Sequence, residues 1–134
     1  MSASDPTDQR PTCEPTLRAV AMPADANASG DIFGGWLLSQ MDLAGGTLAS
    51  QRSKGRAATV AITAMTFHRP VFVGDLVTCY AEIQRVGHTS ITIKVESWAR
   101  RGLGGEEVEV TEGIFTYVAV DDERKPRLVP PEGS

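Results

Sequence analysis

Residues 34–53, GGWLLSQMDLAGGTLASQRS, determine the architecture of the domain. Apolar side chains recur there at steps of four, three and four, the period of an α-helix with one buried face, at Leu37, Met41, Ala44 and Leu48. Gly55 follows and is a residue type that commonly ends a helix. The stretch therefore predicts one helix of about five turns that is buried along one side.

On both sides of this helix the pattern changes to that of strands. Residues 16–22, TLRAVAM, alternate in part and stop at Pro23, and a loop of turn-forming residues fills 24–33. After the helix, side chains alternate with a period of two in four longer segments, at 56–70, 74–87, 88–100 and 106–122. Gly74-Asp75 and Gly87-His88 separate neighbouring segments as hairpin turns would.

The order of these elements is strand, helix and four strands, which predicts a two-layer α+β domain. The helix is expected to pack on one face of a five-stranded antiparallel sheet. A single helix of this length covers only part of such a sheet. The uncovered apolar surface and the exposed edge of the sheet therefore predict a second subunit.

Composition narrows the class of protein. The chain has 134 residues, a net charge of −4 and a pI near 5.1, which suits one acidic domain and argues against nucleic acid or an anionic membrane as partner. No apolar run is long enough to span a bilayer, and residues 1–16 lack the pattern of a secretory signal. We expect two tails, 1–13 and 126–134, around a domain at 14–125. Two separate cysteines, Cys13 and Cys79, indicate free thiols in a cytoplasmic protein, and no metal-ligand spacing is present.

The start of the predicted helix carries Gly34 and Gly35. The first N–H groups of a helix have no internal acceptor and lie at the positive end of its dipole. Glycines without side chains let a ligand oxygen approach these groups, and a carbonyl that gains negative charge would be stabilised there. Glycine pairs are also common at flexible loop-to-helix junctions, so both interpretations stay open.

Asp42 lies in the same predicted helix, beside the apolar stripe. Its neighbours at steps of three and four are small or apolar, namely Leu38, Gly45, Gly46 and Ala49. Each of the two glycines costs about 1 kcal/mol relative to alanine inside a helix, which makes sense if a second backbone or a substrate passes close by. A carboxylate partly withdrawn from water would suit a general base, although most aspartates in mid-helix lie on a solvated face.

Asn27 stands too far before the helix to be its N-cap, a role that suits Asp31 better. An asparagine in such a loop usually forms a turn, but it can also orient a water or a carbonyl group.

Three segments of the chain resemble a known family. They are 27–46 (NASGDIFGGWLLSQMDLAGG), 59–101 (TVAITAMTFHRPVFVGDLVTCYAEIQRVGHTSITIKVESWARR) and 110–122 (VTEGIFTYVAVDD). Over about residues 14–125 the chain is similar to the acyl-CoA thioesterases of the hotdog fold, in particular the YciA-type bacterial enzymes. The resemblance implies a long central helix on a five-stranded antiparallel sheet. It also implies that acyl-CoA is hydrolysed to a carboxylic acid and coenzyme A, with no metal and no cofactor beyond the coenzyme A of the substrate.

The resemblance also assigns roles to residues. Asp42 matches the catalytic aspartate, Asn27 the asparagine that assists at the thioester, and Gly34 and Gly35 the helix start that polarises the carbonyl. The segments expected to line the coenzyme A site contain Phe67, His68, Arg69, Pro70, Arg85, Gly87, His88, Thr89 and Ser90. Close relatives are expected to carry a basic residue where His88 stands. Arg69, Arg85, Arg100 and Arg101 are candidates to meet the phosphates, and each could equally be a solvated charge at a strand end.

The spacing of Gly34 and Asp42 adds an expectation about assembly. Eight residues correspond to about 12 Å along a helix, so both groups of one helix cannot reach one thioester. Two antiparallel helices across a twofold axis would solve this, each site taking the helix start of one subunit and Asp42 of the other. We expect a homodimer as the active unit, and the family often forms trimers of dimers.

Two other functions are alternatives to acyl-CoA hydrolysis. One is that of a hotdog dehydratase, which needs a histidine beside the carboxylate. The other is that of a protein that binds acyl-CoA as a sensor without hydrolysing it.

Overall fold

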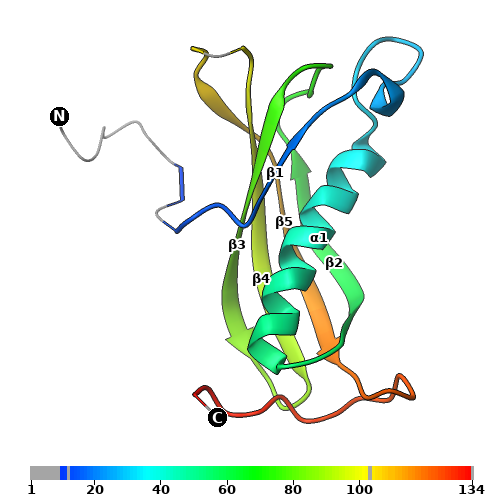
Figure 1. Cartoon of the computed structure of the whole chain (residues 1–134), viewed down its shortest axis with the longest axis vertical. Helices are drawn as coiled ribbons and strands as arrows, with labels where there is room; N and C mark the ends of the chain where they lie inside the picture. The colour runs from blue at the N-terminus through cyan, green and yellow to red at the C-terminus, as the bar shows by residue number, and fades with distance from the viewer. Residues whose placement is uncertain (1–9, 12, 103, 134) are drawn as a thin grey trace, which may run out of the picture.

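A computed structural model of the chain describes residues 10, 11, 13–102 and 104–133. Its elements are β1 (Leu17–Val20), the short 3-10 helix η1 (Pro23–Asp25), α1 (Gly34–Ser53), β2 (Ala57–Phe67), β3 (Leu76–Val86), β4 (Ser90–Arg100) and β5 (Glu107–Ala119) (Figure 1). The predicted order of one strand, one long helix and four long strands is confirmed. Neither helix of the described chain combines the length and apolarity needed to cross a membrane.

The five strands form one antiparallel sheet in the order β1-β3-β4-β5-β2. The predicted hairpin at Gly87 is confirmed, since Gly87 N donates to Ser90 O at 2.7 Å between β3 and β4. The predicted hairpin at Gly74-Asp75 is wrong, because β4 and β5 lie between β2 and β3 and the connection crosses the sheet. Gly74 has a φ of 92°, and the buried Asp75 carboxylate accepts a hydrogen bond from Phe72 N at 2.9 Å. These residues therefore shape a crossover rather than a hairpin.

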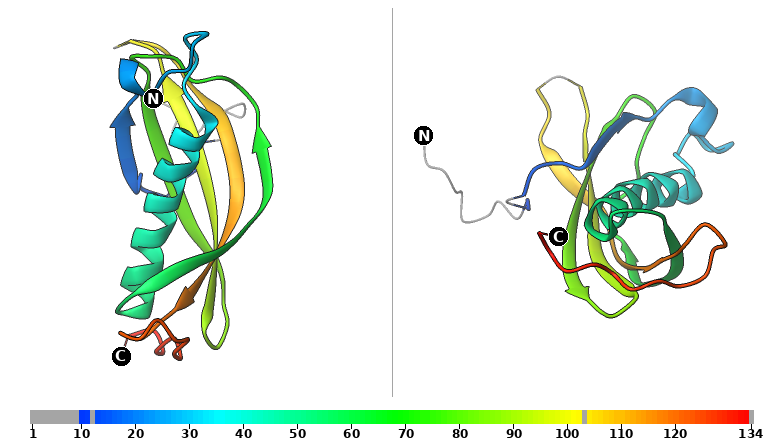
Figure 2. Two further views of the ribbon diagram at one scale, coloured as in Figure 1. Left: turned by 90° about the vertical axis from the view of Figure 1, so that its right-hand side faces the viewer. Right: turned by 60° about the horizontal axis from the view of Figure 1, so that its bottom comes forward.

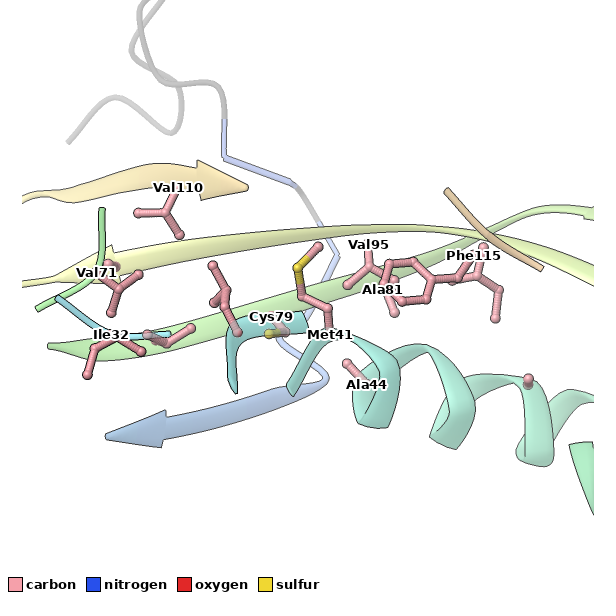
Figure 3. Close-up of a cluster of buried hydrophobic side chains, with 14 of the residues drawn as sticks. Ile32, Met41, Ala44, Val71, Cys79, Ala81, Val95, Val110 and Phe115 are labelled. Carbon is pink, nitrogen blue, oxygen red and sulfur yellow. The ribbon is translucent and has the colours of Figure 1, made fainter. Parts of the chain in front are cut away.

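The core lies between α1 and the concave face of the sheet, which curves around the helix (Figure 2). Met41 and Ala44 point from the helix toward Cys79, Val95 and Phe115 of the sheet (Figure 3). The predicted helix stripe is confirmed, with three of its members buried and Leu48 half-buried. The alternation also predicts inward faces for β3 and β4. Their residues Val77, Cys79, Ala81, Ile91, Ile93 and Val95 are buried, whereas Ile83 is half-buried.

The ends of α1 differ in detail from the prediction. Phe33, not Asp31, precedes the first helical residue, and no side chain caps it. At the other end Lys54, not Gly55, adopts the left-handed conformation, with a φ of 56°. The helix therefore begins without a side-chain cap, which leaves its first N–H groups available.

The C-terminal segment passes beneath the end of α1 (Figure 1). Arg127 donates hydrogen bonds to Ser53 O at 2.8 Å and to Val120 O at 2.9 Å, and Arg52 donates to Pro130 O at 2.7 Å. Residues 126–130, expected to begin a tail, are thus bound to the domain. Most of the expected N-terminal tail, residues 1–9 and 12, lies outside the described residues.

Candidate active site

The half-buried side chain of Asp42 meets two hydroxyl groups that come from the sheet. Thr59 of β2 donates from Oγ1 to Asp42 Oδ1 at 2.7 Å. The hydroxyl of Tyr117, on β5, lies 3.0 Å from the same oxygen and 3.1 Å from the main-chain oxygen of Asp42. Within the described chain, Oδ2 accepts no hydrogen bond from any group, and it is not sealed from solvent. One carboxylate oxygen is therefore held and the other is available.

Tyr117 is fixed as a donor by its surroundings. Its side chain is 1% exposed and its ring stacks on Phe115, with centroids 6.3 Å apart. Burial, followed by the nearby charge of Asp42 and the hydrogen bond to it, raises the pKa of Tyr117 above its usual range. The hydroxyl therefore keeps its proton at neutral pH.

The two glycines that follow Asp42 make room for this tyrosine. A Cβ atom at Gly45 would lie 3.0 Å from the ring carbons Cε2 and Cζ of Tyr117, which is too close, whereas one at Gly46 would lie 3.7 Å from Cε1. The expectation that a second backbone or a substrate passes here is wrong for Gly45. The ring of Tyr117 occupies that space, and it brings the hydroxyl to Asp42.

The start of α1 is open. Gly34 and Gly35 are exposed, and their N–H groups have no acceptor among the described residues. The ring of Phe67 lies beside this point, because a Cβ atom on Gly34 would be 3.7 Å from Phe67 Cε1. Two unpaired donors thus stand at the positive end of the helix, next to an exposed aromatic ring.

Asn27 builds the turn that leads into this helix start. Its Oδ1 accepts hydrogen bonds from Ser29 N at 2.9 Å and from Asp31 N at 3.1 Å. Its own N–H donates to Asp31 O at 2.7 Å. Turn formation, one of the two roles considered for Asn27, is therefore seen directly, and in the described chain its side-chain NH₂ group has no partner.

The two segments expected to line the coenzyme A site do not meet within one chain. Phe67 pairs with Thr111, which pairs with Ser97, whereas Ser90 begins β4. Ser97 and Ser90 are seven residues apart on β4, which corresponds to about 23 Å. Segment 67–70 lies at the end of the sheet near the start of α1, and segment 85–90 lies at the opposite end (Figure 1).

The candidate arginines differ in how far they are engaged. Arg101 pairs with Asp75 at 3.4 Å and stacks over Phe72, and Arg100 lies 3.4 Å from Glu107. Arg69 donates to Glu109 O at 3.2 Å. Among these four arginines, and within the described chain, only the side chain of Arg85 forms no hydrogen bond or ion pair. Arg85 is therefore the candidate most available to an incoming phosphate.

His68 joins a cluster of acidic groups on the outer face of the sheet. Its Nε2 lies 3.1 Å from Glu112 Oε2 and 3.6 Å from Glu109 Oε1. Each of the three residues offers one atom that could bind a metal ion, and these atoms lie within 4.8 Å of one another. Burial, together with Glu96 and Glu112, raises the pKa of Glu109 to about 8. The raised pKa favours a protonated, neutral Glu109, which lessens the charge repulsion among these carboxylates. The sequence did not reveal the cluster because His68 is far from the two glutamates along the chain.

The edge strand β2 is exposed along most of its length. Its apolar side chains Val60, Ile62 and Phe67 are 56%, 38% and 57% exposed, and Leu43 on the neighbouring helix is 56% exposed. An apolar edge of this kind favours pairing with another chain. The expected uncovered surface is therefore present, and it lies on the side of the fold that carries Asp42 and Thr59.

Comparison with known proteins places this chain in a family. The family model of the thioesterase superfamily matches residues 29–105. The acyl-CoA thioester hydrolase YciA of Escherichia coli (strain K12) is 50% identical over 129 residues, which cover 94% of this chain and 98% of that protein. A hexameric thioesterase from Yersinia pestis superposes with a TM-score of 0.86 at 52% identity, covering 91% of this chain and 99% of that chain. For a hexameric hotdog fold thioesterase of Campylobacter jejuni the TM-score is 0.84 at 42% identity, covering 90% and 93%. The chain therefore belongs to the thioesterase superfamily, as a hotdog-fold member of the YciA-type acyl-CoA thioester hydrolases.

Proposed function

We propose that this protein hydrolyses acyl-CoA to a carboxylic acid and free coenzyme A, with Asp42 as the reacting carboxylate. The observation that carries the proposal is the state of that carboxylate, which has one oxygen held by two hydroxyl groups and the other available. The names of the relatives support the substrate class. The N–H groups of Gly34 and Gly35 are proposed as the donors to the oxyanion.

The reaction can follow either of two routes. In the first, Asp42 takes a proton from water, and the hydroxide oxygen adds to the thioester carbonyl carbon. The oxyanion then collapses, the C–S bond breaks, and the coenzyme A sulfur leaves with the electron pair and takes the proton from Asp42. In the second, Asp42 itself adds to the carbonyl carbon, the thiolate leaves, and water hydrolyses the resulting anhydride. Neither route calls for a metal or a further cofactor.

We also propose that each site is shared by two chains. The helix rise of about 12 Å between Gly34 and Asp42 is too long for both to act on one carbonyl. On β2, Thr59 holds Asp42 and Phe67 lies beside Gly34. If two copies pair their β2 edges antiparallel about Thr63, Thr59 of one copy lies opposite Phe67 of the other.

The same pairing would also join the two coenzyme A segments. Tyr117, which holds Asp42, pairs with Ile91 at the base of the hairpin at 85–90. That hairpin would therefore accompany Asp42, while segment 67–70 would arrive from the other copy with the helix start. The active unit is then a homodimer, and three such dimers would give the hexamer seen in the relatives from Yersinia pestis and Campylobacter jejuni. We expect the enzyme to work in the cytoplasm, where its two unpaired cysteines stay reduced.

The first test replaces Asp42 with alanine. We expect turnover of a good acyl-CoA substrate, followed by free-thiol release, to fall about 10²–10⁴-fold while the melting curve changes little. A folded variant with near-normal turnover would exclude Asp42 as the reacting group. A wild-type protein that binds acyl-CoA without releasing thiol would instead support the sensor alternative.

The second test asks whether the site is shared. Asn27 forms the turn that leads into the Gly34 helix start of its own chain, and Asp42 would serve the other site, so Asn27→Ala and Asp42→Ala would damage opposite halves of each site. Each variant alone should be inactive, whereas in a mixed dimer one site carries both changes and the other carries neither. Unfolding and refolding the two together should restore roughly a quarter of wild-type activity. No recovery, with subunit exchange verified by differently tagged chains, would refute the shared site.

A further inference from the structure

The two hydroxyl groups around Asp42 share a feature that suggests a second layer of the site. Both approach from the sheet and both meet the same oxygen, Oδ1, at 2.7 Å from Thr59 and 3.0 Å from Tyr117. A carboxylate that is held at one oxygen by two donors cannot rotate without losing both hydrogen bonds. Its other oxygen is therefore fixed in direction although it contacts no protein group.

We propose that Tyr117 and Thr59 are positioning residues that hold Oδ1 of Asp42, so that Oδ2 is the oxygen that reacts. The proposal rests on the proposed function of Asp42. Oδ2 then takes the proton from water or, on the second route, adds to the carbonyl carbon. Neither hydroxyl group needs to touch the substrate for this role.

Packing around Tyr117 shows why its hydroxyl is well suited to hold a group in place. The ring lies between the stacked Phe115 and the bare backbone of Gly45, so it has little room to tilt. Its single proton is directed at Asp42 alone, either at Oδ1 or at the main-chain oxygen. A tyrosine whose ring is packed on two sides, and whose raised pKa keeps its proton in place at neutral pH, fixes the position of the aspartate relative to the sheet.

The charges near Asp42 offer no alternative restraint. In the described chain, no lysine, arginine or histidine forms an ion pair or hydrogen bond with this carboxylate. Thr59 comes from the edge strand and Tyr117 from its neighbour, so the restraint depends on the pairing of β2 with β5, where Thr59 lies directly opposite Tyr117. The direction of the carboxylate is therefore set by two neutral donors on adjacent strands.

The test compares variants that remove only one hydroxyl group. Tyr117→Phe and Thr59→Val should each lower kcat by about 10–100-fold and leave KM within about threefold of wild type, as expected when a group that orients a reacting side chain is lost. Thr59→Ser keeps a hydroxyl group and should restore most of the rate. Tyr80→Phe is the matched control, because Tyr80 is the other tyrosine of the chain, is buried, and has no contact with Asp42.

The outcomes separate this proposal from the one on which it rests. Tyr117→Phe with a kcat within twofold of wild type, or Thr59→Ser as impaired as Thr59→Val, would overturn the positioning role. An equal loss in Tyr80→Phe would also overturn it, since loss of stability rather than of position would then explain the rates. If Asp42→Ala keeps its activity, the proposed function fails whatever the tyrosine variants show. Thr59 lies on an exposed strand, so its variants test the proposal even if Tyr117→Phe does not fold.

Discussion

Gly45 and Gly46 occupy adjacent positions of one helix but face different space, and the pair therefore tests how Tyr117 packs. Replacing either glycine with alanine should gain about 1 kcal/mol in helix propensity. At Gly46 the new Cβ atom would lie 3.7 Å from Tyr117 Cε1, an ordinary contact. We expect Gly46→Ala to raise the free energy of unfolding by about 1 kcal/mol, which corresponds to about 3–5 °C in Tm for a domain of this size.

At Gly45 the same methyl group should be harmful. The Cβ atom would lie 3.0 Å from two ring carbons of Tyr117 and closer still to the hydroxyl oxygen. Overpacking in a core costs about 1–3 kcal/mol, which cancels or exceeds the gain in propensity. The ring would have to move away from Asp42, so kcat should fall while KM changes little.

The assay measures Tm at one fixed protein concentration, because assembly contributes to stability, and steady-state hydrolysis of the same preparations. Gly45→Ala as stable and as active as Gly46→Ala would refute the packing of Tyr117 against the helix. Gly46→Ala that is destabilised would mean that a second chain, rather than the tyrosine alone, lies against this part of the helix.

Two further predictions concern stability. Arg127→Ala should lower the free energy of unfolding by about 2–3 kcal/mol in urea denaturation, because it removes charged donors from Ser53 O and Val120 O. Arg56→Ala is the control, since the side chain of Arg56 makes no hydrogen bond in the described chain, and it should change the free energy of unfolding little. Glu109→Gln should stabilise the protein at pH 8 relative to wild type, and the difference should vanish toward pH 4.5, because the raised pKa of about 8 means that the folded state favours the protonated acid. Melting curves across this pH range would contradict the second prediction if the two proteins unfolded in parallel.

The positions of the helix and strands could be predicted from the sequence better than the pairing of the strands in the sheet. The period of the apolar side chains places the helix at residues 34–53, as observed, because periodicity depends only on local geometry. The same local information made Gly74-Asp75 resemble a hairpin, although β2 and β3 are not neighbours. Strand order depends on contacts between distant segments, and a period of two gives no sign of which strand will lie alongside.

The site was predicted in the same uneven way. Asp42 and the helix-start glycines are recognisable because they interrupt a helical pattern. Tyr117 and Thr59 were missed because their importance comes from meeting a residue far along the chain. One signal was present, since Tyr117 alternates with the apolar Phe115 on the inward face of β5, and a buried tyrosine hydroxyl normally needs a partner.

The strand order has a consequence for how the molecule folds. β3, β4 and β5 follow one another along the chain and pair as neighbours, whereas Ala57 at the start of β2 pairs with Ala119 at the end of β5. Because closing a long loop costs more entropy than closing a short one, the central three strands should form the folding nucleus and β2 should join it late. The hydrogen bond from Thr59 to Asp42 would then be among the last to form and the first to open in local unfolding. A second subunit paired with the edge of β2 would stabilise this part of the sheet, which forms last and opens first. The carboxylate of Asp42 would then become ordered when the two subunits assemble.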